Sequence, residues 1–249
     1  MSVVLPAAVV VALLGVWAAV WQAAVFPASA LPSPLAVLTA FRGEISSGRL
    51  VTDLVTSLYR VTVGFILSVI TGVPLGLWMG QQASARLAFL PLVNFFRDLS
   101  PLAWIPFAIL WFGVGDAPSI FLIYMAAVFP ITVATMAAVA GIPSVYSRVA
   151  QTFNLSGREK LFNVTLPAIM PQVITSLRVT AGVSWLVVVA AEMIAGRDGL
   201  GFAVMDSRNG LRTDILVAEM IVIGVVGVAI DRALVQLTRL PSVRWGYER

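Results

Sequence analysis

The chain of 249 residues has no cysteine, no histidine and a single lysine. It therefore forms no disulfide and offers no thiol nucleophile, imidazole base or common transition-metal ligand set, which argues against a conventional hydrolase centre. Lys160, the lysine, has no Gly-rich Gly-Lys-Ser/Thr sequence around it, so we expect no phosphate-binding loop in this chain. We expect the chain to bind no metal and no cofactor.

Charged residues are also scarce. Only 11% of the residues are Asp, Glu, Lys or Arg, whereas 59% are hydrophobic and the mean hydropathy is +0.96, far from the composition of soluble domains. The net charge of +4 comes from basic residues scattered over connections and chain ends. This distribution fits cytoplasmic loops of a membrane protein better than a nucleic-acid interface.

The apolar runs predict an all-α, polytopic membrane protein with a single transmembrane domain, because about 20 apolar residues are needed for each crossing. The six predicted spans are residues 5–26, 57–80, 87–113, 119–140, 173–195 and 215–237. The first run resembles a secretory signal, but it is long and no basic residue precedes it, so we interpret it as a membrane helix. An amphipathic stretch at 35–45 is expected on the outer surface.

Small residues are spaced regularly in the second predicted span. Gly64, Gly72, Gly76 and Gly80 recur at steps of four or eight residues, which places them on one helix face. Small residues on one face let two membrane helices approach closely. We predict that this face packs tightly against a neighbouring helix.

The third predicted span is interrupted by polar residues and a proline at 97–101. Ten residues at about 1.5 Å each place Arg97 near the bilayer midplane if the span enters near residue 87. A guanidinium there suits a small oxyanion, and the hypothetical substrate path comprises Arg97, Asp98, Ser100 and Trp104. The alternative is that Arg97 pairs with an acid such as Asp98, or reaches the interface, and only positions helices.

Two acidic residues lie near the outer ends of the last two spans, Glu192 and Glu219. Acids at such positions more often anchor helices than carry ions, so we do not interpret them as proton relays. The sequence GRDGLG at 196–201 lacks the strand-turn-helix context of a dinucleotide site and is expected to form an outward turn.

The polar segment 141–172 is predicted to be a cytoplasmic helix-turn-helix. Pro143 opens the first helix, Asn154 suits its end because asparagine tolerates the left-handed conformation, and Ser156 to Glu159 has capping-box spacing. Pro167 and Pro171 are expected to limit the second helix. Exposed apolar side chains in this loop indicate a docking surface.

The same loop resembles that of the permeases of binding-protein-dependent ABC importers, which carry Glu-Ala-Ala, a glycine four positions on and a closing Ile-x-Leu-Pro. The segment RVAQTFNLSGREKLFNVTLP keeps the spacing, with Arg148 at the acidic position and Asn154 at the glycine. LPSP before the second span, PLAWIPFAILWFGVGD in the third and AAEMIAGRDGLG after the fifth resemble the nitrate, taurine and alkanesulfonate branch.

The resemblance implies a type I ABC importer permease in the bacterial inner membrane. The basic residues of the 141–172 loop and of the tail indicate that both are cytoplasmic, and six spans then place both termini in the cytoplasm. Implied partners are a second copy of the chain, two ABC ATPase subunits that hydrolyse the ATP, and an external substrate-binding protein, which the outward turn at 196–201 would touch. It implies that the 143–167 loop docks on the ATPase. The implied docking residues are Tyr146, Arg148, Ala150, Phe153, Asn154, Leu155, Gly157, Leu166 and Pro167.

Two other classes of protein remain possible from the residues alone. A secondary carrier driven by an ion gradient would transport without an ATPase, and a membrane enzyme would need acids or histidines clustered at one depth. Histidine is absent and the acids are dispersed, which disfavours the enzyme. The sequence does not name the solute, for which sulfonate, nitrate or bicarbonate are the expected types.

Overall fold

The computed structural model describes residues 4–27 and 29–238, and within these ranges every regular element is a helix. The helices are α1 (Val4–Gln22), α2 (Pro34–Ser46), α3 (Arg49–Gln81), α4 (Ala83–Asp98), α5 (Ile105–Phe112), α6 (Asp116–Ala140), α7 (Ser144–Thr152), α8 (Gly157–Lys160), α9 (Leu166–Ala195), α10 (Leu200–Asn209) and α11 (Thr213–Thr238). A 3-10 turn, Pro101–Trp104, and a π-helical turn, Leu161–Thr165, complete the order. The predicted all-α fold is confirmed.

Among residues 4–27 and 29–238, five helical segments are long and apolar enough to cross a membrane. They are Leu5–Gln22, Arg49–Gln81, Asp116–Ala140, Gly157–Ala195 and Thr213–Gln236. The remaining predicted span, 87–113, is divided into α4, the 3-10 turn and α5. The chain is extended at Leu99 and Ser100 because the residue before a proline avoids the helical region, and Pro101 then opens the 3-10 turn.

Two expectations about helix ends were wrong. The second membrane helix begins at Arg49, eight residues before the predicted start, because its polar first turns continue the helix beyond the apolar run. Pro167 and Pro171 do not limit the second loop helix, since the helical segment runs on from Gly157 to Ala195. The π-helical turn before Pro167 alters the hydrogen-bond pattern there, and Pro171 is tolerated inside the membrane helix α9.

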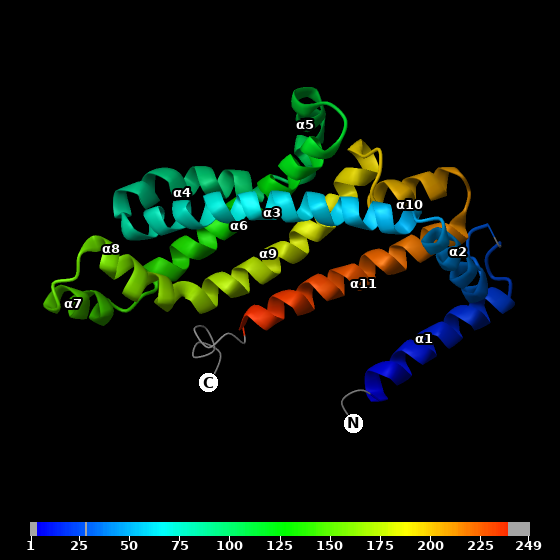
Figure 1. The fold of residues 1–249 in the computed structure, drawn as a ribbon, viewed down its shortest axis with the longest axis horizontal. Coiled ribbons are helices and arrows are strands. Elements are labelled where there is room, and N and C mark those ends of the chain that lie inside the picture. Colours follow the sequence, from blue (N-terminus) through cyan, green and yellow to red (C-terminus); the bar gives the residue numbers. More distant parts are fainter. Residues whose placement is uncertain (1–3, 28, 239–249) are drawn as a thin grey trace.

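The predicted close packing of the second span is confirmed, and its partner is α6, which crosses directly beside α3 (Figure 1). A Cβ atom added at Gly76 would lie 2.6 Å from the carbonyl oxygen of Thr132. Gly64, Gly72 and Gly80 leave similarly little room. The two helix backbones therefore approach closely along most of α3, and α9 packs on the other side of α6.

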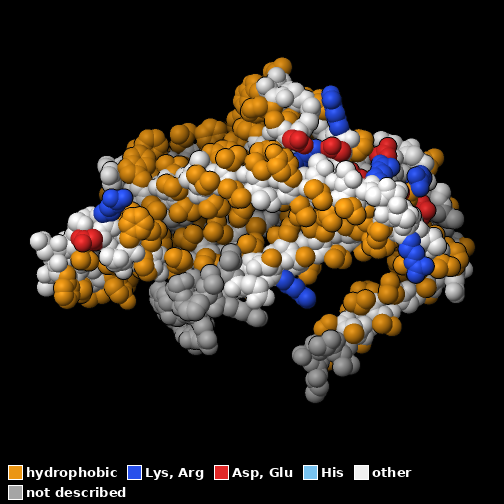
Figure 2. All heavy atoms as spheres, viewed as in Figure 1, with side chains coloured by type: hydrophobic (Ala, Val, Ile, Leu, Met, Phe, Trp, Pro, Cys, Tyr) orange, Lys and Arg blue, Asp and Glu red, His pale blue; other side chains and the backbone are white. Residues whose placement is uncertain are grey.

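The molecule has two distinct ends (Figure 1). We call the end with α7 and α8 the loop end, and the end with α2 and α10 the far end. Figure 2 shows apolar side chains covering the middle of this face, whereas most charged side chains gather at the far end. Such a band is the surface that lipid requires.

Two apolar elements extend from the bundle. α1 lies apart from the other long helices in Figure 1 and contacts α2. Trp17 of α1 donates a hydrogen bond from Nε1 to the carbonyl of Pro32, which precedes α2, at 3.1 Å. α5 stands out on another side, with Leu110 and Trp111 exposed in the single chain.

The α3–α6 contact gives a first testable prediction. Gly76→Ala forces the two backbones apart and should cost about 1–3 kcal/mol by overpacking, whereas Gly224→Ala in α11 adds its methyl group to open space. Both variants make the same exchange within a membrane helix. Thermal unfolding of the purified protein should show a lower midpoint for Gly76→Ala, and equal midpoints for both variants would contradict the packing.

Candidate functional site

At the loop end, α7 finishes in a Schellman motif that Asn154 makes possible. Asn154 has a φ of +52°, which a residue with a short polar side chain adopts more readily than most. The amide of Leu155 donates to the carbonyl of Ala150 at 3.0 Å, and the amide of Asn154 donates to that of Gln151 at 2.9 Å. The turn expected at Asn154 is therefore present.

The second loop helix begins at a complete capping box. The Ser156 hydroxyl accepts from the Glu159 amide, and a carboxylate oxygen of Glu159 accepts from the Ser156 amide at 2.8 Å. These reciprocal bonds fix the angle at which α8 leaves the turn, and α8 continues through the π-helical turn into α9.

The predicted docking residues fall into two groups. Tyr146, Arg148 and Phe153 are exposed, with 74% of the Phe153 side chain accessible, and so are Asn154 and Gly157. Ala150 is buried, and Leu155, Leu166 and Pro167 are half-buried against the loop and the start of α9. The exposed group is accessible on the loop surface, and the buried group packs inside the loop.

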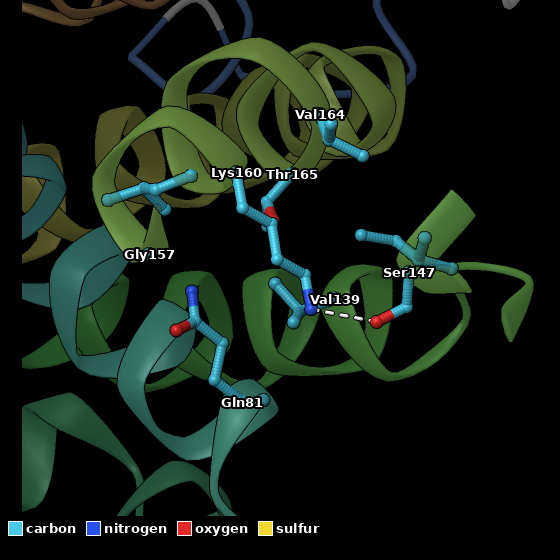
Figure 3. A pocket seen from close by; sticks show the side chains of 10 residues that line it. Gln81, Val139, Ser147, Gly157, Lys160, Val164 and Thr165 are labelled. Atoms are coloured by element: carbon cyan, nitrogen blue, oxygen red, sulfur yellow. Dashed lines mark hydrogen bonds between the residues drawn. The ribbon is translucent and has the colours of Figure 1, made fainter. Parts of the chain in front are cut away.

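A cavity of about 430 Å³ separates this loop from the ends of α3 and α6. Its wall includes Gln81, Val139, Ser147 and Lys160 (Figure 3). The ammonium of Lys160 donates to the Ser147 hydroxyl at 2.7 Å and so joins α8 to α7 across this space. The loop is thus braced internally by one polar contact.

In the broken third span, Arg97 is at the end of α4 and its Nε donates to Asp98 at 3.2 Å. Ser100 is exposed in the single chain, and Trp104 packs edge-on against Phe121 with ring centroids 6.3 Å apart. The structure brings Arg97 and Asp98 together, which agrees with the alternative of a helix-positioning pair. It does not assemble all four predicted residues into one pocket.

Sequence reasoning missed a buried cluster in the far half of the molecule, centred on Arg60 of α3. The Arg60 side chain is 1% exposed, and each of its three nitrogen atoms contacts a carboxylate. Its Nε donates to Asp116 at 2.7 Å, and Nη1 donates to Glu192 at 2.9 Å and to the carbonyl of Asp198 at 2.9 Å. Its Nη2 binds the carboxylates of Asp116 and Asp198.

The fully buried Glu192 carboxylate is bonded on every side. It accepts from the Ser57 hydroxyl at 2.8 Å, from Arg60, and from the Gly201 amide at 3.0 Å. A buried carboxylate persists only when it is paired and hydrogen-bonded in this way. Glu192 is therefore the kind of anchor that its position near the end of the span predicted.

The GRDGLG segment is held by side chains one helical turn apart on α3. The Gly199 amide donates to Asp53 at 2.9 Å, and the Leu200 amide donates to Ser57 at 2.9 Å. Gly199 has a φ of +97°, and a Cβ atom there would lie 2.5 Å from the Glu192 carboxyl carbon. The glycines thus serve close packing, and α10 follows where only a turn was expected.

Similarity to known proteins agrees with this arrangement. The profile of the family described as "Binding-protein-dependent transport system inner membrane component" matches residues 72–240. The chain belongs to this family. It is thus the permease subunit of an ABC importer, and the predicted resemblance is confirmed.

Individual relatives cover most of the chain. It is 35% identical to the taurine transport system permease protein of Escherichia coli, over 75% of this chain and 68% of that one. It is 32% identical to a nitrate import permease protein of Synechocystis, over 96% of this chain and 89% of that one. A putative ABC transporter permease of Methanocaldococcus jannaschii is 38% identical over 78% of this chain and 73% of that one.

A solved structure shows the same fold. The chain superimposes on a chain of the MetNI methionine ABC transporter in an inward-facing conformation with a TM-score of 0.68 at 17% identity. The match covers 76% of this chain and 94% of that chain. The predicted type I importer permease fold is therefore confirmed.

The Schellman turn gives a second prediction. Asn154→Ala should loosen the turn because alanine lacks the side chain that eases a positive φ, at a cost of about 1 kcal/mol, whereas Asn154→Gly should preserve it. Hydrogen exchange of residues 144–165 should be faster in the alanine variant than in the wild type. Equal exchange in the alanine and glycine variants would contradict this assignment.

Proposed function

We propose that this permease imports a small anion into the cytoplasm and is driven by a separate ATPase that docks on the 143–167 loop. The observation that carries the proposal is the braced helix-turn-helix between α6 and α9, which exposes Tyr146 and Phe153 at one end of a membrane bundle. Aromatic side chains on an exposed surface are typical anchors of protein interfaces.

The loop has the connections that a coupling element needs. α6 leads into it and α9 leads out of it, and both helices are long and apolar enough to cross the membrane. A partner that displaces α7 therefore acts on two membrane helices at once. In this proposal the 143–167 loop is cytoplasmic and the broken third span also crosses the membrane. The chain then crosses six times, so both of its ends are on the cytoplasmic side.

Relatives support the class of solute. Those that are similar over most of this chain are named for taurine, nitrate, aliphatic sulfonates and bicarbonate, all of which carry an anionic group. Arg97, Asp98, Ser100 and Trp104 are our candidates for the substrate path, because they surround the break in the third span. Arginine recognises oxyanions through its planar fork of donors.

The assembly we propose contains two copies of this chain, two ATPase subunits and an external binding protein that meets the far end. The apolar surfaces of α1 and α5, which are exposed in the single chain, are available to the second copy and to lipid. Because the neighbouring subunit hydrolyses the ATP, this chain needs no nucleotide site.

The docking surface gives a third prediction. Phe153→Ser removes an exposed aromatic anchor and should reduce the ATPase that co-purifies with the permease by about tenfold or more, as interface hot spots do. Leu211→Ser is the matched control, since Leu211 is 81% exposed at the far end and should not contact the ATPase. Wild-type recovery of the ATPase with Phe153→Ser would contradict the docking role.

The substrate path gives a fourth prediction. Arg97→Ala should raise the solute concentration needed for half-maximal import in proteoliposomes, because the solute loses a charged partner, while the complex still assembles. Arg97→Lys should retain part of the affinity, since it keeps the charge. Unchanged import by an assembled Arg97→Ala complex would show that Arg97 only positions helices through Asp98.

A further inference from the structure

The partners of Arg60 differ in their access to water. Glu192 is fully buried, whereas the side chains of Asp116 and Asp198 are each 53% exposed. One guanidinium therefore joins a buried carboxylate to two carboxylates at the far-end surface. We call Asp116, Arg60 and Asp198 the far-end clasp.

The buried ion pair between Arg60 and Glu192 is expected to stay intact when the surface contacts of Arg60 break. Arg60 and Glu192 neutralise each other away from water, and separating them would leave an uncompensated charge on each side. Ser57 and the Gly201 amide hold the same carboxylate. This pair keeps α3 and α9 together irrespective of what happens at the surface.

The contacts of Arg60 with Asp116 and Asp198 can break more easily. Water can solvate Asp116 or Asp198 when either leaves Arg60, because both carboxylates are 53% exposed, and Arg60 keeps Glu192 as its partner. Asp116 and Asp198 bring two negative charges to the same guanidinium, and these charges repel each other. The single positive charge of Arg60 does not offset them, because Glu192 already balances it. Asp116 has a second source of stabilisation in the first turn of α6, where a negative charge is favoured.

The clasp joins the turn between α5 and α6 to the loop between α9 and α10. Asp116 follows a turn in which Gly113 has a φ of +75° and Gly115 a φ of +149°, both facing open space. This turn connects α6 to α5, the short helix beyond the break in the third span. Asp198 is in the loop between α9 and α10, whose backbone α3 holds.

From this geometry we infer that the far-end clasp is a gate: opening of the Asp116–Arg60–Asp198 contacts releases the α5–α6 turn from the α9–α10 loop, while the Arg60–Glu192 pair stays closed. The gate lies at the face we assign to the external binding protein and adjoins the span with the candidate path. It rests on the proposed import function. ATP hydrolysis at the loop end and docking at the far end are then linked through α6.

Neutral substitutions test the gate in the assembled complex with its ATPase and binding protein. Asp116→Asn and Asp198→Asn should raise ATP hydrolysis without binding protein, and the ratio of stimulated to basal hydrolysis should fall about two- to fivefold, the shift expected for loss of one ion pair whose carboxylate is half exposed. A purely structural role would lower both rates together and leave the ratio unchanged. Asp206→Asn, which breaks the exposed pair with Arg49 at the same end, is the matched control and should keep the wild-type ratio.

A crosslink tests the same inference directly, because the chain contains no cysteine. Asp116→Cys with Asp198→Cys, bridged by a short cleavable thiol reagent, should stop transport, and cleavage should restore it. Each single variant treated with the reagent should continue to transport. Transport by the bridged complex at the unbridged rate, or a wild-type hydrolysis ratio in both asparagine variants, would overturn the gate. Absence of stimulated hydrolysis in the wild-type complex would instead overturn the proposed function.

Discussion

The ion pair between Arg60 and Glu192 is the interaction on which the far half of this permease depends. It unites α3 and α9 through two residues that are 132 positions apart along the chain, at a place that is shielded from water. In such surroundings neither charge is tolerable without the other. Because Asp53, Ser57 and Arg60 also bind the backbone of residues 198–200, one face of α3 determines where the α9–α10 loop lies.

The same face of α3 continues as the glycine face that packs on α6. At the glycines the backbones of α3 and α6 are so close that even a Cβ atom would not fit between them. Such close packing leaves the two helices little freedom to slide past each other. α6 then leads into the helix-turn-helix at the loop end, and α9 returns from it. The ion-pair cluster and the proposed docking loop therefore belong to one continuous set of packed helices.

Much of this arrangement was predictable from the sequence because its causes are local. Asn154, the Ser156–Glu159 capping box and the glycine spacing each depend on residues within a turn or two of one another. The Arg60 cluster was missed, although an arginine inside the predicted span 57–80 was a signal of the kind that drew attention to Arg97. Its partners come from α6, α9 and the GRDGLG segment, and no local pattern pairs residues across such distances. The continuation of α9 past Pro167 was missed because the π-helical turn has no clear sequence signature.

We propose that the helix-turn-helix at the loop end binds an ATPase, whose movements displace the membrane helices. Site-specific crosslinking from a cysteine introduced at position 153 of the otherwise cysteine-free chain tests it most directly in the transporting complex. We predict a covalent product with the ATPase subunit, and none from a cysteine at position 35 in α2 at the far end. A complex that imports solute but yields no ATPase product from position 153 or from its neighbours on the loop would contradict the account.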